Sequence, residues 1–346
     1  MNHQDQIEAL TDALRIRAGL RNPGVIAHPA AERFAEQNVL LNLAEAFGEM
    51  NPRKGSGPTA ALAAGLTSSD FITVLSDTAR AVLISKLAAF GEHRLICAER
   101  ELPNFHNHDF PLVDSDPLLD EISENGEIPN DVFVTAVEGL QARVRPFGKN
   151  LFLRRQLIRN DDIGLFSGLL GNIAASAARL EAKLVFNLIE SNPLMGDQMV
   201  MFHEDHGNIG AVAPLALGSL SEGFAALRNM LLPSGEKANL EARYIVVSPG
   251  FELYARGLLR DYDLKSVGVV VAPWITSTNW YLVADPKLAP TVSLLYLKGS
   301  KRGVTVGKAR PKPGQENRDG VTLGVRFDTG VVAVGRVGIF QGRIPS

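Results

Sequence analysis

The sequence predicts an α+β fold, in which helices and antiparallel strands follow one another in irregular order. Three observations support this class. A long amphipathic helical pattern covers residues 160–191, shorter helical patterns lie on both sides of it, and several short β-like segments follow residue 242. Because regular strand–helix–strand units are missing, α+β fits better than a doubly wound sheet. A length of 346 residues indicates two or three structural units.

Residues 1–66 are expected to form two small amphipathic helices on a tether. Ile7, Leu10, Leu14 and Ala18 recur at helical spacing, and a second helical pattern runs through "AAERFAEQNVLLNLAEAFGEM". The segment "NPRKGSGPTAALAAG" then has the proline, glycine and serine content of a linker. Neither helix can bury much surface alone, so we expect each to need a partner, another copy, or removal.

The next helix is expected to begin at Ser68-Ser69-Asp70, where side-chain oxygens can cap free backbone N–H groups, and to end near Gly91. Short strand-like segments then surround a long polar insert, "PNFHNHDFPLVDSDPLLDEISENGEIPND". A structureless insert of that length is uncommon in a compact domain. It should therefore be disordered, a lid, or an arm that reaches a neighbouring molecule.

The long helix is the clearest element of the sequence. Asn160 or Asp161 can cap its start, and Ser191-Asn192-Pro193 ends it. At ~1.5 Å per residue it should be roughly 45 Å long. Its apolar stripe is expected to step by three and four residues through Ile163, Phe166, Leu170, Ile173, Ala177, Leu180, Leu184 and Leu188. Near the end of the chain, Asp328-Thr329-Gly330 is predicted to be the turn between the last two strands.

Composition excludes several classes of protein. The net charge of −3 provides no global basic field for nucleic acid, and the single cysteine, Cys97, rules out an intramolecular disulfide. The first residues lack the pattern of a secretory signal, and no apolar run approaches the ~20 residues that span a bilayer. We therefore expect a soluble protein of a reducing compartment.

The segment "MFHEDHGNIG", residues 201–210, is the first candidate for chemistry. His203 and His206 bracket two acids, and histidines three apart on a helix can share a metal ion. The zinc-protease pattern requires histidines four apart, however, and the sequence nominates no third ligand. The flanking residues are turn-formers. We therefore predict a turn in which these side chains bond the backbone and one another.

Other candidates have ordinary interpretations as well. The pair His106 and His108 lies in the long insert and is predicted to be solvated. The loop "GSKRGVTVGK" lacks the spacing of a phosphate-binding loop. Acids at the start of the long helix, the two tryptophans and the cysteine fit helix capping and packing: Asp161, Asp162, Trp274, Trp280 and Cys97. No catalytic, cofactor-binding or metal-binding constellation assembles from these residues.

Five blocks of the sequence carry a resemblance to a known family: "TSSDFITVLSDTARAVL", "RRQLIRNDDIGLFSGLLGNIAASAARLEAKLVFNLIESNP", "MFHEDHGNIG", "RYIVVSPGFE" and "NWYLVADP". In this order the chain resembles the major capsid proteins of tailed phages with the Hong Kong 97-like fold, and most closely the Mu-like major head subunit family. The likeness covers roughly residues 66–346. Its most specific part is the long helix joined to the histidine-rich segment.

The resemblance implies a role for each segment. It implies a scaffold-like or tether segment at 1–66, an N-arm helix at 67–91, an extended loop over a neighbouring subunit at 92–158, a peripheral domain at 159–221 with its spine helix at 160–191, an axial domain at 222–310, and strands returning to the peripheral domain at 311–346. It brings no catalytic residues and no cofactor.

The implied function is that of a major capsid protein, which self-assembles into the icosahedral shell around double-stranded phage or prophage DNA. Its implied partners are its own copies in hexamers and pentamers, a portal, scaffold, prohead protease and decoration proteins, and packaged DNA contacted non-specifically, with no membrane. It would assemble in the host cytoplasm and reside in the virion. The alternatives are an encapsulin-like compartment shell, a minor head protein, and a metal-dependent hydrolase that uses His203 and His206.

Overall fold

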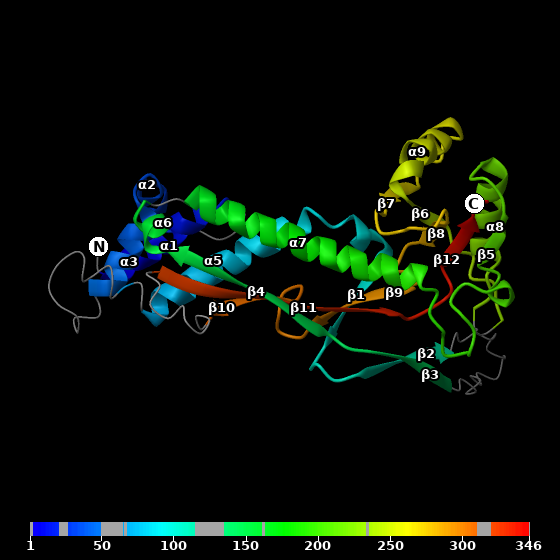
Figure 1. The fold of residues 1–346 in the computed structure, drawn as a ribbon, viewed down its shortest axis with the longest axis horizontal. Coiled ribbons are helices and arrows are strands. Elements are labelled where there is room, and N and C mark those ends of the chain that lie inside the picture. Colours follow the sequence, from blue (N-terminus) through cyan, green and yellow to red (C-terminus); the bar gives the residue numbers. More distant parts are fainter. Residues whose placement is uncertain are drawn as a thin grey trace, which may run out of the picture. The chain divides into compact units, whose positions relative to one another are not determined.

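The computed structural model describes residues 3–20, 27–49, 65, 68–114, 135–160, 163–232, 235–309 and 320–345 (Figure 1). The chain forms two compact units. Unit 1 comprises residues 1–90, 146–179 and 299–328, and unit 2 comprises residues 91–145, 180–298 and 329–346. The mixture of helices with parallel and antiparallel strands confirms the predicted α+β class.

Unit 1 packs the N-terminal helices against α5 (Ser69–Ala88). The second predicted helix is in fact two, α2 (Ala31–Ala35) and α3 (Val39–Glu49), which follow α1 (His3–Arg17). These helices find their apolar partner within the same chain, since α1 and α3 both contact α5 and the rings of Phe47 and Phe71 meet edge to face at 6.5 Å. The expected cap also forms, because Ser68 Oγ accepts the N–H groups of Asp70 and Phe71.

The remainder of unit 1 is a small sheet with short helices beside it. β10 (Val304–Lys308) pairs antiparallel with the first half of β11 (Gly320–Ala333), and β4 (Arg145–Arg154) pairs with β11 on the other side. α5 packs on β10, and the short α6 (Arg155–Arg159) contacts α3. Leu323 and Val325 are buried within this sheet.

Unit 2 contains a five-stranded sheet in the order β5-β12-β8-β6-β7. Its strands are β5 (Ile209–Val212), β6 (Ala242–Val247), β7 (Gly268–Val271), β8 (Trp280–Ala284) and β12 (Ile339–Arg343). The helices α8 (Leu217–Asn229) and α9 (Glu252–Asp261) share one apolar core with this sheet (Figure 1). A separate core joins the sheet to the C-terminal part of the long helix.

Three further strands and a hairpin complete unit 2. β1 (Cys97–Leu102) follows the 3₁₀ helix η1 (Glu92–Ile96) and pairs parallel with β9 (Val292–Leu297). β9 pairs antiparallel with residues 329–333 of β11. β2 (His108–Asp114), within the predicted insert, and β3 (Thr135–Ala142), after it, pair as an antiparallel hairpin.

The predicted turn at Asp328-Thr329-Gly330 is wrong, because these residues lie inside the continuous strand β11. The strand changes its hydrogen-bonding neighbour here, from β10 before residue 328 to β9 after it. Asp328 and Thr329 are buried, and a Cβ added at Gly330 would lie 2.4 Å from the carbonyl oxygen of Arg143. The glycine therefore permits a close backbone approach rather than a turn.

The long helix is confirmed as α7 (Ile163–Glu190), with a stripe that differs from the predicted one. After Leu170 the buried positions are the small residues Ala174, Ala178 and Ala182, followed by Val185, Phe186 and Ile189. The prediction followed the larger apolar side chains, whereas the helix buries its alanines. Among the described residues, α7 is the one helix whose length and composition would let it cross a bilayer, a test that the core helix of a soluble protein also passes.

Gly342→Ala should destabilise the protein. Gly342 of β12 pairs with Trp280 of β8, and an added Cβ would lie 1.9 Å from the buried indole ring. Overpacking of this kind costs about 1–3 kcal/mol of unfolding free energy. Urea unfolding followed by tryptophan fluorescence measures the change. Gly257→Ala in α9 is the matched control, because its Cβ meets nothing within 4 Å and alanine favours a helix. Equal stability of both variants would contradict the packing argument.

Candidate functional site

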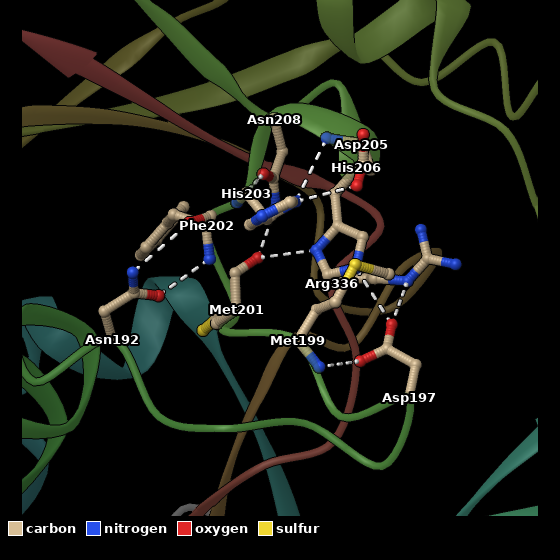
Figure 2. A network of polar contacts seen from close by, with 10 residues as sticks. All are labelled: Asn192, Asp197, Met199, Met201, Phe202, His203, Asp205, His206, Asn208 and Arg336. Carbon is tan, nitrogen blue, oxygen red and sulfur yellow. Dashed lines mark hydrogen bonds and ion pairs between the residues drawn. The ribbon is translucent and has the colours of Figure 1, made fainter.

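The segment "MFHEDHGNIG" lies between α7 and β5 and forms a turn, as predicted (Figure 2). Glu204–His206 make the single 3₁₀ turn η2, and Gly207 ends it with a left-handed φ of 62°. His203 precedes η2, and its Nδ1 accepts the N–H of Asp205 at 3.2 Å. The imidazole of His203 therefore acts as the cap of this turn, with 40% of its side chain exposed.

His206 points the other way, into the protein, where its side chain is 1% exposed (Figure 2). Its Nε2 lies 2.9 Å from Asp197 Oδ2, and its Nδ1 lies 3.2 Å from the carbonyl oxygen of Met201. Asp197 also pairs with Arg336 Nε at 3.3 Å and accepts the N–H of Met199. Both ring nitrogens of His206 thus contact protein acceptors.

Two asparagines close the loop around these histidines. Asn192 exchanges two hydrogen bonds with the backbone of Phe202, at 2.7 and 3.2 Å. Asn208, fully buried, accepts the N–H of His203 and donates to the Met201 carbonyl at 2.7 Å. The backbone of residues 192–208 is consequently fixed by its own side chains. Within the described parts of the chain, no three His, Cys, Asp or Glu side chains gather as metal ligands would.

A second polar cluster, which the sequence reasoning missed, surrounds Glu181 of α7. The carboxylate is fully buried, and three donors from other elements reach it. His93 Nε2 of η1 lies 2.9 Å from Oε2, Arg94 of η1 pairs with the same oxygen, and the hydroxyl of Tyr296 in β9 donates to Oε1. The cluster therefore joins residues far apart in the sequence.

These donors lower the pKa of the Glu181 carboxyl. Burial alone would raise the pKa of the Glu181 carboxyl, but the hydrogen bond from His93 and the charge of Arg94 outweigh it and hold that pKa below its usual range. Burial raises the pKa of the Tyr296 hydroxyl, and the charge of Glu181 raises it further. A fully buried carboxylate that accepts from three protein donors is closed to solvent, and we interpret the cluster as a structural one.

A pattern in the sequence could have revealed Glu181. It lies three residues after Ala178 and four before Val185, on the buried stripe of the long helix. An acid on such a stripe has to be paired, because an isolated buried charge is very costly. The prediction followed the larger apolar side chains and did not consider Glu181, although it lies four residues after Ala177 and three before Leu184 of the predicted stripe.

A third acid, Glu190 at the end of α7, fixes the loop before β8. Its Oε1 accepts the N–H groups of Thr276 and Ser277 at 2.9 and 2.7 Å. Burial would raise the pKa of this carboxyl, yet these hydrogen bonds lower it overall.

The other predicted site residues lie apart from these clusters. His108 and His106 both contact Asn104, the first through its ring and the second through its backbone N–H. Trp274 stacks on Phe186, and Trp280 packs against Phe340, so both tryptophans are packing residues. Cys97 is buried, and burial raises its thiol pKa. Asp161 and Asp162 lie outside the described residues.

Comparison with known proteins identifies a relationship at the level of the family. The family model described as "Phage capsid protein" matches residues 138–341, which is more than half of the chain. Comparison with curated proteins found no match.

Solved structures show weaker likenesses, all of low sequence identity. A virus-like particle from Pyrococcus furiosus has 10% identity and a TM-score of 0.48, over 78% of this chain and 99% of that one. A phage-related protein from Bordetella bronchiseptica RB50 has 11% identity and a TM-score of 0.49, over 76% and 95%. The procapsid of bacteriophage JBD30 has 13% identity and a TM-score of 0.46, over 81% and 77%.

Glu181→Gln should cost about 3–5 kcal/mol of unfolding free energy at pH 7, because it leaves Arg94 buried without its counter-charge. The pKa of Glu181 is lower in the folded chain than in the unfolded one. Its stabilisation is thus complete above the unfolded value of about 4.3 and is lost as pH falls through the folded pKa. Urea unfolding at pH 7 and at pH 3.5 should show a smaller difference between variant and wild type at the lower pH.

Glu101→Gln is the control for this experiment, since Glu101 is an exposed acid of β1. It should change stability by less than about 0.5 kcal/mol at either pH. A Glu181→Gln protein as stable as this control would show that the buried cluster does not hold unit 2 together.

His206→Ala should destabilise the protein by about 1–3 kcal/mol, because it removes a buried imidazole whose ring nitrogens contact Asp197 and the Met201 carbonyl. His203→Ala removes only the exposed cap and should cost less than about 1 kcal/mol. Thermal unfolding of both variants, together with zinc analysis of the wild-type protein, tests this interpretation. One zinc ion per chain that disappears in His203→Ala would instead support the metal-dependent alternative.

Proposed function

We propose the roles of the chain's parts from one premise: this chain belongs to the phage capsid protein family. It is a major capsid protein, a structural protein whose copies self-assemble into the shell of the virion. The match to residues 138–341 carries this conclusion, and it covers the helices α7, α8 and α9 and the strands from β4 to β11. With the observed long helix and hairpin, it confirms the expected Hong Kong 97-like fold and favours a phage shell over an encapsulin-like compartment.

We propose that α7 is the spine helix of a peripheral domain that comprises residues 159–221. Residues 92–158 are the extended loop that overlaps a neighbouring subunit, and the β2–β3 hairpin supports this role because it forms a separate two-stranded sheet. Residues 222–310, with α8 and α9, are the axial domain that meets its copies at fivefold and sixfold centres. Residues 311–346 supply the returning strands β11 and β12.

Residues 1–66 have the proposed role of an internal scaffold that is removed during maturation, with 67–91 remaining as the N-arm helix. The packing of α1 and α3 on α5 supports an assembly role, because these helices cover part of its apolar surface. Removal would expose Phe71, which is fully buried and touches Phe47. A newly exposed apolar face of this kind would need a new partner in the mature shell.

The partners beyond the chain's own copies follow from the same proposal. They are the portal, scaffold and decoration proteins, a prohead protease that cleaves in trans, and packaged DNA contacted without sequence preference. Assembly takes place in the cytoplasm of the bacterial host, in hexamers and pentamers of an icosahedral shell. The chain has no enzymatic role in this scheme, and His203 and His206 serve the turn after α7.

Expression of the chain alone should give shells, rings or capsomers visible by negative-stain electron microscopy. Closed symmetry makes such assembly cooperative, so assembled particles should dominate above a threshold protein concentration. Intact-mass analysis of the same sample, with and without the phage protease, tests the removal of about the first 66 residues. A species that stays monomeric or dimeric at every concentration, with scaffold and protease present, would contradict the proposed function.

A further inference from the structure

Asp197 lies between two nitrogen-bearing side chains and forms a hydrogen bond with only one of them (Figure 2). Its Oδ2 atom is 2.9 Å from His206 Nε2, which is a hydrogen-bonding distance, and 3.3 Å from Arg336 Nε. The Nε–H group of Arg336 is buried and makes no hydrogen bond with any residue that the structure describes. A buried donor without an acceptor is costly. One carboxylate oxygen is therefore shared unequally by two side chains, and the weaker partner has an unused donor.

The surroundings of the His206 ring favour its doubly protonated form. Nε2 faces the Asp197 carboxylate, and Nδ1 lies 3.2 Å from the carbonyl oxygen of Met201. A carbonyl oxygen and an ionised carboxylate can only accept hydrogen bonds, whereas a neutral imidazole has one N–H group and one lone pair. Only the imidazolium donates to both oxygens at once. In a neutral ring, one lone pair would face an oxygen.

Loss of a ring proton can be relieved at Asp197 but not at Met201. The Met201 backbone is held in place, since its carbonyl accepts from Asn208 at 2.7 Å and its N–H donates to Pro193 at 2.9 Å. The side chains of Asp197 and Arg336 are 28% and 23% exposed, which leaves room for a small rotation. A carboxylate that turns away from Nε2 of the histidine gains the unused N–H of the arginine.

The charged and titratable groups around His206 come from three segments. Asp197 belongs to the loop after α7, and Arg336 to the connection between β11 and β12. On the turn of His206 itself, the ring of His203 lies 5.9 Å away, and its Nδ1 is 3.3 Å from Asp205 Oδ2. The side chains of His203 and Asp205 are 40% and 73% exposed, so solvent screens their charges. The carboxylate of Asp197 and the guanidinium of Arg336 are therefore the dominant partners of the buried ring.

We propose that Asp197, His206 and Arg336 form a proton-dependent switch. The Asp197 carboxylate binds His206 when the imidazole is charged and Arg336 when the imidazole is neutral. The proton on Nε2 goes to solvent, and the hydrogen bond from Nε2 to Oδ2 is replaced by one from the Arg336 Nε–H to Oδ2. Nδ1 keeps its proton and its contact with the Met201 carbonyl. Histidine is the side chain whose charge ordinarily changes between pH 5 and 8, which is the range in which such a switch is useful.

The switch decides which distant segment holds the loop of residues 193–201. The charged ring fastens this loop to the turn before β5, whereas the neutral ring leaves it fastened to the connection before β12. All three residues lie in unit 2. The inference does not depend on the proposed shell function, because the exchange takes place within one folded chain.

Double-mutant cycles at two pH values test which partner holds Asp197. The changes are Asp197→Asn, His206→Gln and Arg336→Gln, made singly and in the two pairs that include Asp197, and urea unfolding measures each. At pH 5.5 we expect the Asp197–His206 pair to be coupled by about fivefold or more in the folding equilibrium constant, and the Asp197–Arg336 pair to show the smaller coupling. At pH 8.5, where histidine is ordinarily neutral, the order should reverse.

Arg228 and Glu241 are the matched control pair, because they form an exposed ion pair of 2.7 Å in the same unit. A guanidinium and a carboxylate keep their charges between pH 5.5 and 8.5, so the coupling between Arg228→Gln and Glu241→Gln should be the same at both values. Circular dichroism confirms that each variant is folded. If the couplings of the Asp197 pairs change with pH no more than this control, the proposal is overturned.

Nitrogen NMR of the unsubstituted chain examines the proton directly and does not depend on the folding of a variant. The seven histidines are labelled with ¹⁵N, and solid-state spectra serve for assembled and unassembled protein alike. The signals that disappear in His206→Gln belong to His206. We expect both of its ring nitrogens to be protonated at pH 5.5 and Nδ1 alone at pH 8.5. A ring with the same protonation at both pH values would overturn the switch, as would a neutral ring that keeps its proton on Nε2.

Discussion

The fully buried carboxylate of Glu181 is the interaction on which unit 2 depends. Apolar contacts along α7 are non-directional, and they leave the rotation of a smooth, alanine-rich stripe poorly defined. A buried carboxylate with three donors removes that freedom, because His93, Arg94 and Tyr296 satisfy it in one arrangement. The carboxylate thereby fixes this part of α7 against both η1 and β9.

Two further acids after Glu181 also hold distant segments of the chain. Glu190 binds the backbone of the loop before β8, and Asp197 joins His206 to Arg336 near the end of the chain. Three acids in succession therefore attach one stretch of chain to segments far away in the sequence. A shell subunit benefits from such fixed geometry, since summed weak contacts between copies are productive only when each subunit presents the same surface. We regard the histidine-rich turn as one part of this series.

Sequence reasoning identified what depends on local pattern and missed what depends on contacts over long range. The α+β class, α7, the Ser68 cap and the turn around His206 followed from periodicity and capping chemistry. The role of Gly330 could not be predicted from the sequence. A glycine that allows a neighbouring strand to approach closely and a glycine that forms a turn are the same residue in the sequence, and only the contact with Arg143 distinguishes them. Glu181 was missed because alanines on the buried face carry little hydrophobic signal.

Cys97 has a practical consequence for work on this protein. It is the only thiol in the chain and lies buried in the core of unit 2, where burial raises its pKa and so suppresses the reactive thiolate. We therefore expect the folded protein to react only slowly with thiol reagents. A cysteine introduced on the surface, for example at an exposed position of α5 or α9, would then be the single reactive site for a spin label, a fluorophore or a crosslinker. The contacts between copies could be mapped without first removing a native residue.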